Sequence, residues 1–263
     1  MMSRKLRPDT IFDIGMHEGQ DTAYYLHRGY KVVAVDANPT LCDAGAKRFE
    51  AAISAGRLEI VNAAVGAERG VLPFYVSSKD IWSSFDPAVA GKLGSSCREI
   101  QVESLCAADL FAKYGVPYYL KIDIEGADSY CLGDLEPSCL PVYISFEAGA
   151  TASEDVTRLE RLGYRRFKLI NQVSKEFRSE WEPEPALQRL RLRLRRKFRN
   201  VIRGRWRNDW IFEMNSSGPF GEDTDGSWVS AVRLREILAR WKNLDDHNST
   251  SPDSFWFDVH AAR

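Results

Sequence analysis

Five residues near the N-terminus have the types and spacing needed to hold an adenosine-containing ligand. They are Asp13, Gly15, Gly19, Thr22 and Asp36. Glycines at the first and last positions of a short loop let the backbone approach a ligand closely, and a helix that starts there presents free N–H groups to an anion. A carboxylate at position 36 can accept hydrogen bonds from both hydroxyls of a ribose. These residues predict a nucleoside ligand that also carries a carboxylate or a phosphate.

Two apolar runs are expected to place these residues at one edge of a sheet. Residues 11–14 and 31–35 are predicted to be buried parallel strands. The helix between them is expected at 23–27, capped by Asp21 or Thr22. Because ligands of such folds bind beyond the carboxyl ends of the strands, the site is expected where both strands end.

The glycine spacing distinguishes two kinds of nucleotide site. The dinucleotide fingerprint G-x-G-x-x-G is absent, because position 17 is a histidine. The pattern D-x-G-x-x-x-G-x-x-T, which starts at Asp13 and ends at Thr22, resembles motif I of the class I S-adenosylmethionine (SAM) methyltransferases. The alternative is a glycine-bearing turn of another α/β protein, since short glycine motifs are found in unrelated folds.

The chain after Pro39 is expected to complete one wall of the site. A helix is predicted at 41–55 and a third strand at 58–65. The small residues Asn62 and Ala63 near the end of that strand form either a flat wall for an adenine ring or a close-packed part of the sheet. The stretch 79–96 is rich in serine and glycine, and it is expected to be a loop near the site.

A second stretch, 118–128, carries charged residues in an otherwise apolar run. Lys121, Asp123 and Glu125 alternate with apolar neighbours. Charged side chains are costly in a buried parallel strand unless they are paired or used. If this strand lies beside the first one, the three side chains border the same crevice, and the alternation places them on one side. The alternative is an exposed edge strand.

The combination of motifs resembles the FkbM-type methyltransferase family over residues 9–170. The matching segments are D-I-G-x-x-x-G-x-D-T, V-D-A-N-P and K-I-D-I-E-G-A-D, in the order and spacing of the family. Met16-His17-Glu18 and Asp128 depart from the commoner residues. The resemblance implies a SAM-dependent O-methyltransferase that acts on hydroxyls of sugars, glycolipids or secondary metabolites. It also implies a class I Rossmann-like α/β fold with a mostly parallel, seven-stranded sheet flanked by helices.

Within this reaction, each polar residue has an expected role. Asp123 is the first choice for the base or the residue that orients the acceptor, and His17 is the second. Glu125 is expected to assist them, while Lys121 and Glu147 are expected near the acceptor. Asp13, Gly15, Gly19, Thr22, Asp36, Asn62 and Ala63 are expected to bind the cofactor, SAM. No spacing in the sequence requires a metal ion.

The second half of the chain is expected to extend the sheet and then cover the site. Strands are predicted at 141–149 and 165–171, a helix at 153–162, and a seventh strand at 209–214. A further helix is expected at 228–241, and the aromatic end 255–260 is expected to belong to a lid. The predicted organisation is a SAM-binding core at 1–171, a basic insert at 172–208, and a last strand with a C-terminal lid at 209–263 in the same domain.

The insert contains ten basic residues and no acidic ones between positions 186 and 208. Read as a helix, it has one apolar stripe, so it would be a basic amphipathic helix. Such a helix packs on its own domain or a second subunit, or binds an anionic membrane surface. Nucleic acid is the least favoured partner. Basic and apolar residues alternate strictly at 189–194, so a strand is an alternative to a helix there.

Composition indicates a globular protein with one large domain. The chain has 263 residues and a net charge of −1, and its five cysteines form no C-x-x-C pair. Reduced thiols and the absence of an apolar leader-like stretch predict a cytoplasmic protein, with a location at a membrane surface as the alternative. Two other functions stay open: a nucleotide-dependent oxidoreductase, and a module that docks on anionic surfaces with a degenerate site.

Overall fold

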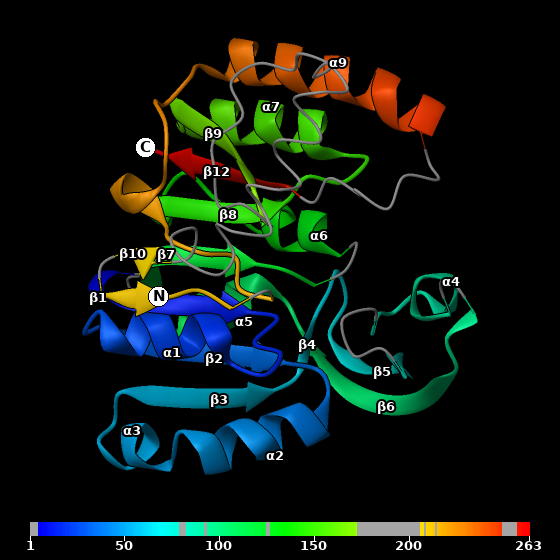
Figure 1. Cartoon of the computed structure of the whole chain (residues 1–263). Coiled ribbons are helices and arrows are strands. Elements are labelled where there is room, and N and C mark those ends of the chain that lie inside the picture. The colour runs from blue at the N-terminus through cyan, green and yellow to red at the C-terminus, as the bar shows by residue number, and fades with distance from the viewer. Residues whose placement is uncertain are drawn as a thin grey trace.

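A twisted seven-stranded sheet forms the centre of the molecule (Figure 1). This computed structural model describes residues 5–78, 83–91, 94–124, 127–172, 206–207, 209–213, 215–248 and 257–263. In spatial order, the strands are β3 (Leu58–Asn62), β2 (Lys31–Asp36), β1 (Leu6–Ile14), β7 (Val116–Ile122), β8 (Tyr143–Glu147), β12 (Phe257–Ala262) and β9 (Arg166–Asn171). The first five are parallel, and β12 runs antiparallel to both of its neighbours.

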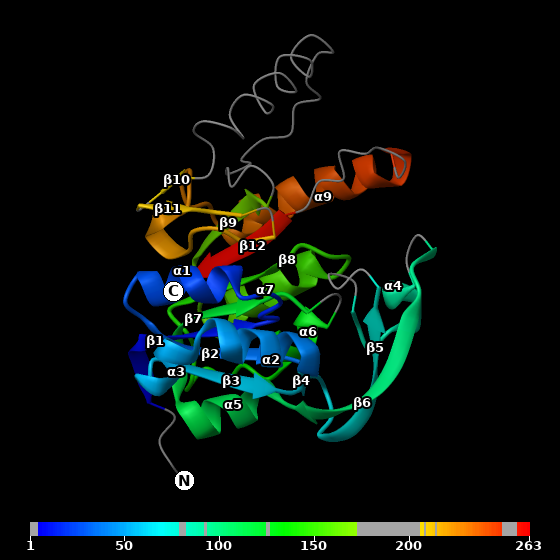
Figure 2. The ribbon, with the colours of Figure 1, turned by 60° about the horizontal axis from the view of Figure 1, so that its bottom comes forward.

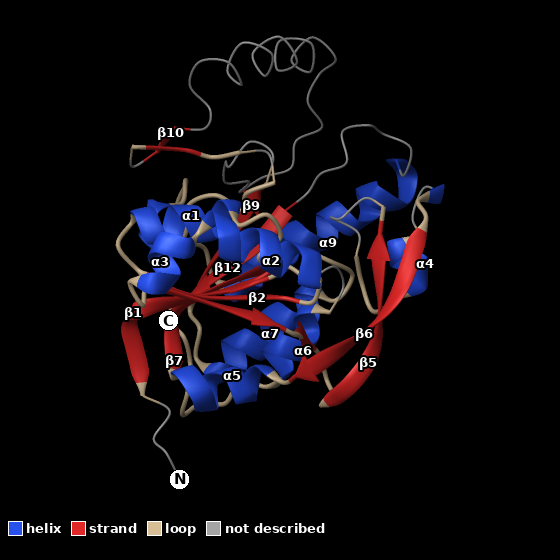
Figure 3. Cartoon of the chain, turned by 90° about the horizontal axis from the view of Figure 1, so that it is seen from below, coloured by secondary structure: helices blue, strands red, loops and turns tan. Residues whose placement is uncertain are grey.

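Helices cover both faces of this sheet (Figure 3). One face packs against α5 (Ala107–Tyr114), α6 (Asp128–Gly133), α7 (Ala152–Leu162) and α9 (Ala231–Asn248). The other face packs against α1 (Gln20–His27), α2 (Pro39–Arg48) and α3 (Glu50–Ser54), together with Phe212 and Phe220. Because successive side chains of a strand point to opposite faces, Ile11 joins the second core while Phe12 joins the first. Parallel strands covered in this way explain the continuous apolar runs in the sequence.

A second, three-stranded sheet projects from the main one (Figures 1 and 2). It contains β4 (Ala64–Val65), β6 (Cys97–Leu105) and β5 (Gly70–Ser77), and the short helix α4 (Pro87–Ala90) lies beside it. The strand predicted at 58–65 is therefore divided between two sheets. The backbone N–H of Ala63 donates to the carbonyl of Asp36 at 3.0 Å, which turns the chain out of the main sheet. The helix predicted at 41–55 is also divided, at Phe49.

The seventh strand of the main sheet is not the predicted one. Among the described residues, Trp210–Ile211 (β11) pairs only with Trp206–Arg207 (β10), whereas Phe257–Ala262 lies between β8 and β9. All six residues of this strand, β12, are buried, so the prediction of a lid over 257–260 was wrong. Gly221–Asp223 (η3) forms a 3₁₀ turn before α9.

The basic segment 186–205 lies outside the described residues, so its predicted conformation stays a prediction. None of the helices in the described ranges is both long and apolar enough to span a bilayer.

Candidate active site

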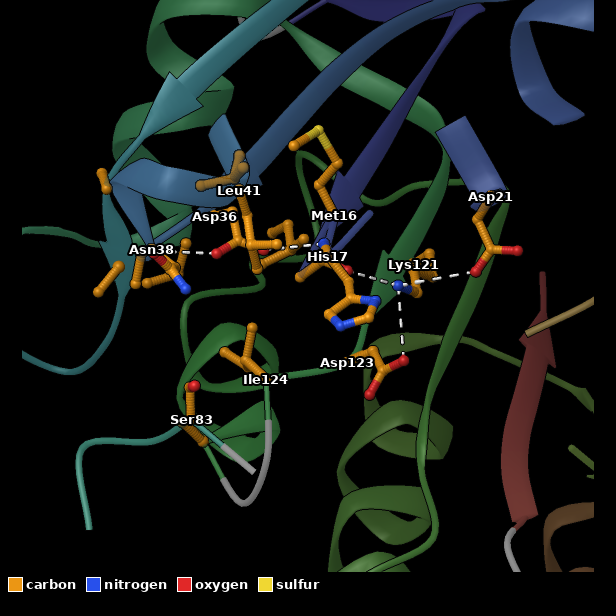
Figure 4. Close-up of a pocket in the computed structure, with 18 of the residues that line it drawn as sticks. Met16, His17, Asp21, Asp36, Asn38, Leu41, Ser83, Lys121, Asp123 and Ile124 are labelled. Carbon is orange, nitrogen blue, oxygen red and sulfur yellow. Dashed lines mark hydrogen bonds and ion pairs between the residues drawn. The ribbon is translucent and has the colours of Figure 1, made fainter. Parts of the chain in front are cut away.

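A cavity opens where β1, β2 and β7 end, as the sequence predicted (Figure 4). Several predicted site residues come together in its lining, namely Gly15, His17, Asp36, Ala63, Lys121 and Asp123. They lie at or just after the carboxyl ends of four neighbouring parallel strands, β3, β2, β1 and β7, and these ends meet at the same edge of the sheet. The expected crevice is therefore present, and its chemistry depends on how these side chains are held.

The loop after β1 is built from residues with left-handed backbone geometry. Gly15 has φ 86°, His17 φ 53° and Gly19 φ 79°. A Cβ on Gly15 would lie 1.8 Å from the carbonyl oxygen of Asp123, and one on Gly19 would lie 2.5 Å from the Phe49 ring. Contacts within the protein and the positive φ therefore already require glycine at both positions, and the close approach of a ligand stays a prediction.

The start of α1 also differs from the prediction. Gly19 is its N-cap residue and no side chain caps the helix. The Thr22 hydroxyl instead donates to Asp13 at 2.6 Å, and the Asp21 carboxylate accepts hydrogen bonds from Ser216 and Ser217. The prediction that Asp21 or Thr22 caps this helix is therefore wrong, because both side chains form hydrogen bonds with residues outside the helix.

Asp36 stands at the end of β2 and holds the loop together. One carboxylate oxygen accepts from the backbone N–H of His17 and the other from that of Asn38, both at 2.8 Å. Burial raises the pKa of Asp36, while the two backbone N–H donors lower it in part. Asp36 lines the cavity, and each carboxylate oxygen can accept a further hydrogen bond from a ligand hydroxyl.

Lys121 lies at the centre of a buried group of charges. Its ammonium donates to the carbonyl of Gly15 at 2.8 Å and lies 3.2 Å from Asp13, 3.5 Å from Asp123 and 3.7 Å from Asp21. Burial alone would lower the pKa of Lys121, but the three carboxylates outweigh it and raise that pKa. The lysine therefore stays charged and ties the cavity floor to β1, α1 and the end of β7.

Asp13 and Thr22 lie beneath the cavity rather than in its wall. Asp13 is fully buried, and burial raises its pKa against the opposing effect of Lys121. Neither side chain belongs to the cavity lining. Their contacts are with each other and with Lys121, so the structure gives them the role of positioning the lysine.

Asp123 presents its carboxylate to the cavity. It follows the last residue of β7, and its backbone N–H donates to the carbonyl of Ile14 at 2.9 Å. The side chain is 29% exposed, in contrast to 4% for Lys121. Because β7 ends at Ile122, the expected alternation along a strand does not extend to Glu125, which lies outside the described residues.

Two further predicted residues do not line the cavity. Glu147 ends β8, and the Asn62 amide donates to the carbonyls of Asp36 at 3.0 Å and Ala37 at 3.3 Å. Glu147 and Asp123 both act on Asp128, whose pKa is raised to about 8, first by burial and then by these two carboxylates. In the described ranges, no three histidine, cysteine or acidic side chains are arranged to hold a metal ion.

The wall that follows β3 is apolar. Ala63, Ala64 and Val65 line it, facing Phe74 and Phe85 of the small sheet and its loop, whose rings lie 5.6 Å apart. Ser83 of the same loop also lines the cavity, so part of the loop predicted at 79–96 lies near the site, whereas Pro87–Ala90 within that range forms α4. Small and aromatic surfaces of this kind suit a planar ring.

Several polar lining residues were not identified from the sequence, among them Asp21, Gln172 and Asn215. Asp21 was expected only as a helix cap, and its partners Ser216 and Ser217 lie almost two hundred residues later. No local pattern marks the other two as site residues. Only the folded chain brings these residues into the same cavity as Asp123.

The residues present fit SAM. Asp36 provides a carboxylate for ribose hydroxyls, and the Ala63 wall provides a surface for a base. The carboxylates of Asp21 and Asp123 face a cavity into which only one ammonium, that of Lys121, projects from the described lining. This charge balance favours a cationic group such as a sulfonium. The Nδ1 atom of His17 is buried and has no hydrogen-bond partner among the described residues.

Comparison with known proteins gives a family match over most of the core. The model of the methyltransferase FkbM domain matches residues 13–172. Among proteins of curated function, none matches the chain.

Solved structures with a similar fold include three methyltransferases. Methyltransferase FkbM of Methylobacillus flagellatus KT is 16% identical, with a TM-score of 0.43, over 64% of this chain and 41% of that chain, so this chain spans about two fifths of its length. The TehB-like SAM-dependent methyltransferase of Corynebacterium glutamicum is 14% identical, with a TM-score of 0.35, over 69% of this chain and 75% of that chain. Phosphoethanolamine N-methyltransferase 2 of Haemonchus contortus, solved with SAM, is 9% identical, with a TM-score of 0.37, over 97% of this chain and 48% of that chain.

The family match, residues 13–172, covers every residue of the cavity lining except Asn215. The main sheet is mostly parallel and has seven strands, as predicted, although its seventh strand is β12 rather than the one expected at 209–214. Six strands run in the same direction, and β12 runs antiparallel to its two neighbours. The chain therefore belongs to the FkbM domain family of methyltransferases, with the class I fold and with SAM as its cofactor, as the sequence predicted.

Proposed function

We propose that this protein transfers the methyl group of SAM to a hydroxyl oxygen of a sugar, a glycan or another small molecule. The observation that supports this proposal is the Asp123 carboxylate, which reaches the cavity while its neighbour Lys121 is buried and charged. When bound, SAM supplies a methyl group on a positively charged sulfur, and the chain must align it with the acceptor.

The cavity residues divide this work between binding and proton handling. Asp36 accepts hydrogen bonds from the ribose, and the wall around Ala63 packs against the base. Asp123 accepts the hydrogen bond of the acceptor hydroxyl, directs its oxygen towards the methyl group and takes up the proton as the oxygen loses it. Lys121, 3.5 Å away, fixes the direction of the Asp123 carboxylate.

His17 is the second candidate for the proton acceptor. Its imidazole lines the same cavity, and Nδ1 is buried without a hydrogen-bond partner in the described part of the chain. Its backbone is fixed by the hydrogen bond to Asp36, so the ring has a defined position. Asp123 is preferred because its carboxylate has a partner that orients it.

The Asp123→Asn variant tests this assignment. It keeps the size of the side chain but loses the charge, so single-turnover methyl transfer with saturating SAM should fall by roughly 10²–10⁴-fold, the usual contribution of a positioned acid or base. SAM affinity, measured by calorimetry, should persist. Asp9→Asn, at an exposed carboxylate that pairs with Lys31 at 3.1 Å, is the matched control.

Two results would change this assignment. Near-normal turnover in Asp123→Asn would remove Asp123 from the chemistry and direct attention to His17. Loss of SAM binding together with turnover would make Asp123 a cofactor residue. An acceptor screen with labelled SAM, and titration of SAM against NAD(H), tests the methyltransferase proposal itself, because an oxidoreductase would bind NAD(H) instead.

A further inference from the structure

The cavity has two sides that differ in their residues. Figure 4 shows Asp36, Asn38 and Leu41 at one side, Asp21 and Lys121 at the other, and His17 between them. The first side follows β2, where the ribose is expected. The second side lies towards the strands after β7 and has no ligand assigned to it. Asp123 borders this second side, next to Lys121.

Two carboxamides from the second half of the chain line the cavity, those of Gln172 and Asn215. Gln172 directly follows β9, which lies at the edge of the sheet farthest from β3. Its Nε2 donates to Oδ1 of Asp258, a buried residue of the neighbouring strand β12. A buried carboxylate therefore holds the amide donor, and the Gln172 side chain has a defined orientation at the cavity.

Asn215 is held in place by its neighbours in sequence. The Ser216 hydroxyl donates to one oxygen of Asp21, and the Ser217 backbone N–H donates to the other at 2.9 Å. The Gly218 N–H donates back to the Ser216 hydroxyl at 3.0 Å. Asp21 is itself buried and lies 3.7 Å from Lys121, so residues 215–218 are tied to the same charged group as Asp123.

The charges on this side disfavour an anion. Among the lysines and arginines that the structure describes, Lys121 alone lines the cavity, and its ammonium already faces three carboxylates. A phosphate or carboxylate placed here would meet Asp21 and Asp123, and like charges brought together cost several kcal/mol in general. Carboxamides donate and accept hydrogen bonds without charge, which matches the needs of a hydroxyl group.

We propose that Gln172 and Asn215 form the acceptor subsite and that this subsite takes an uncharged unit bearing several hydroxyls, such as a neutral sugar. This inference rests on the proposed function, because it assigns the acceptor of that reaction. Each amide binds a hydroxyl of the unit whose neighbouring hydroxyl lies at Asp123. Asp21 is a positioning residue, since it sets the place of Asn215.

The test compares Asn215→Ala and Gln172→Ala with Gln101→Ala, a control at an exposed amide of β6. The probe is a cell extract separated into water-soluble and lipid fractions, incubated with methyl-labelled SAM. SAM affinity should stay within about twofold in every variant, while the amount of extract needed for the half-maximal rate should rise about three- to tenfold in the two cavity variants, as expected for one lost hydrogen bond. Unchanged thermal midpoints would show that the variants fold.

The chemistry of the acceptor is read from the labelled product. When the labelled product is hydrolysed to its monomer units, the labelled unit should pass through an anion exchanger, because it is uncharged. Label retained on the exchanger, an equal loss of SAM affinity in the cavity variants, or no change in the extract requirement would each overturn the subsite. Binding of SAM without transfer to any fraction by the unmodified protein would instead refute the proposed function, and the subsite with it.

Discussion

At the scale of single residues, Asp36 combines a structural and a binding role. It joins two backbone N–H groups of the loop and lines the cavity. Asp36→Ala should weaken SAM binding by about 1.5–3 kcal/mol, the range for hydrogen bonds to a charged group. Calorimetry measures the change, with Asp9→Ala as the control on β1. Unchanged affinity would show that the ribose binds elsewhere.

Asp128 gives a pH-dependent prediction at the same scale. Burial, with Asp123 and Glu147 nearby, raises its pKa from 3.8 to about 8. A carboxyl with a raised pKa binds its proton more tightly in the folded state, so its stabilising contribution is complete below about pH 4 and is lost as the pH rises to about 8.

Asp128→Asn should remove this dependence. Relative to the unmodified protein, the variant should gain on the order of a few kcal/mol in the free energy of unfolding at pH 9 and little at pH 4. Urea unfolding at a series of pH values measures the difference. If the two proteins lose stability in parallel over this range, the titrating group is another carboxyl, such as Asp13 or Asp36.

At the scale of elements, the turn between β1 and α1 depends on close packing against the end of β7. Gly15 and Gly29 have nearly the same φ, 86° and 87°, but a Cβ on Gly29 would meet no atom within 4 Å. Gly29→Ala should therefore cost only the backbone strain, about 1–2 kcal/mol. Gly15→Ala should cost about 1–3 kcal/mol more, because the new carbon collides with the Asp123 carbonyl.

Chemical unfolding of the two variants separates these contributions. Equal losses in the free energy of unfolding would show that the loop moves away from β7 without cost. The comparison also separates packing from ligand approach: Gly15→Ala should lose stability in the absence of SAM, since the collision lies within the protein.

At the scale of the whole molecule, the charge is strongly segregated. Residues 186–208 carry a charge of +10, and the rest of the chain carries −11, to give the net −1. Because each basic residue near an anionic membrane contributes about 1 kcal/mol, the protein should bind vesicles that contain anionic lipid and release them at high salt. Flotation with neutral and anionic vesicles measures this.

Replacing Arg193, Arg195 and Arg196 by glutamine should weaken that binding, and replacing Arg57, Arg69 and Arg233, which lie outside the segment, should not. Equal partitioning to neutral and anionic vesicles, or none to either, would leave packing within the protein as the role of the segment. Salt-sensitive binding without methyl transfer would instead support a docking module.

The sequence by itself determined the family, the first strands and the core of the cavity. Asp13, Gly15, Asp36 and Asp123 lie within short motifs at strand ends, and parallel strands bring such ends to one edge of a sheet. Local patterns suffice here because alternation, turn glycines and the ends of strands are properties of neighbouring residues.

Only the tertiary structure decided which distant segments meet. The segments 209–214 and 257–262 are both short, aromatic and apolar in sequence. Within the described residues only the second enters the main sheet, where it pairs with β8 on one edge and β9 on the other and all six of its residues are buried. In the same way, the sequence predicted Asp21 as a helix cap, but in the structure its carboxylate accepts hydrogen bonds from Ser216 and Ser217. Burial on both faces and hydrogen bonds across the chain depend on three-dimensional packing, which no local pattern records.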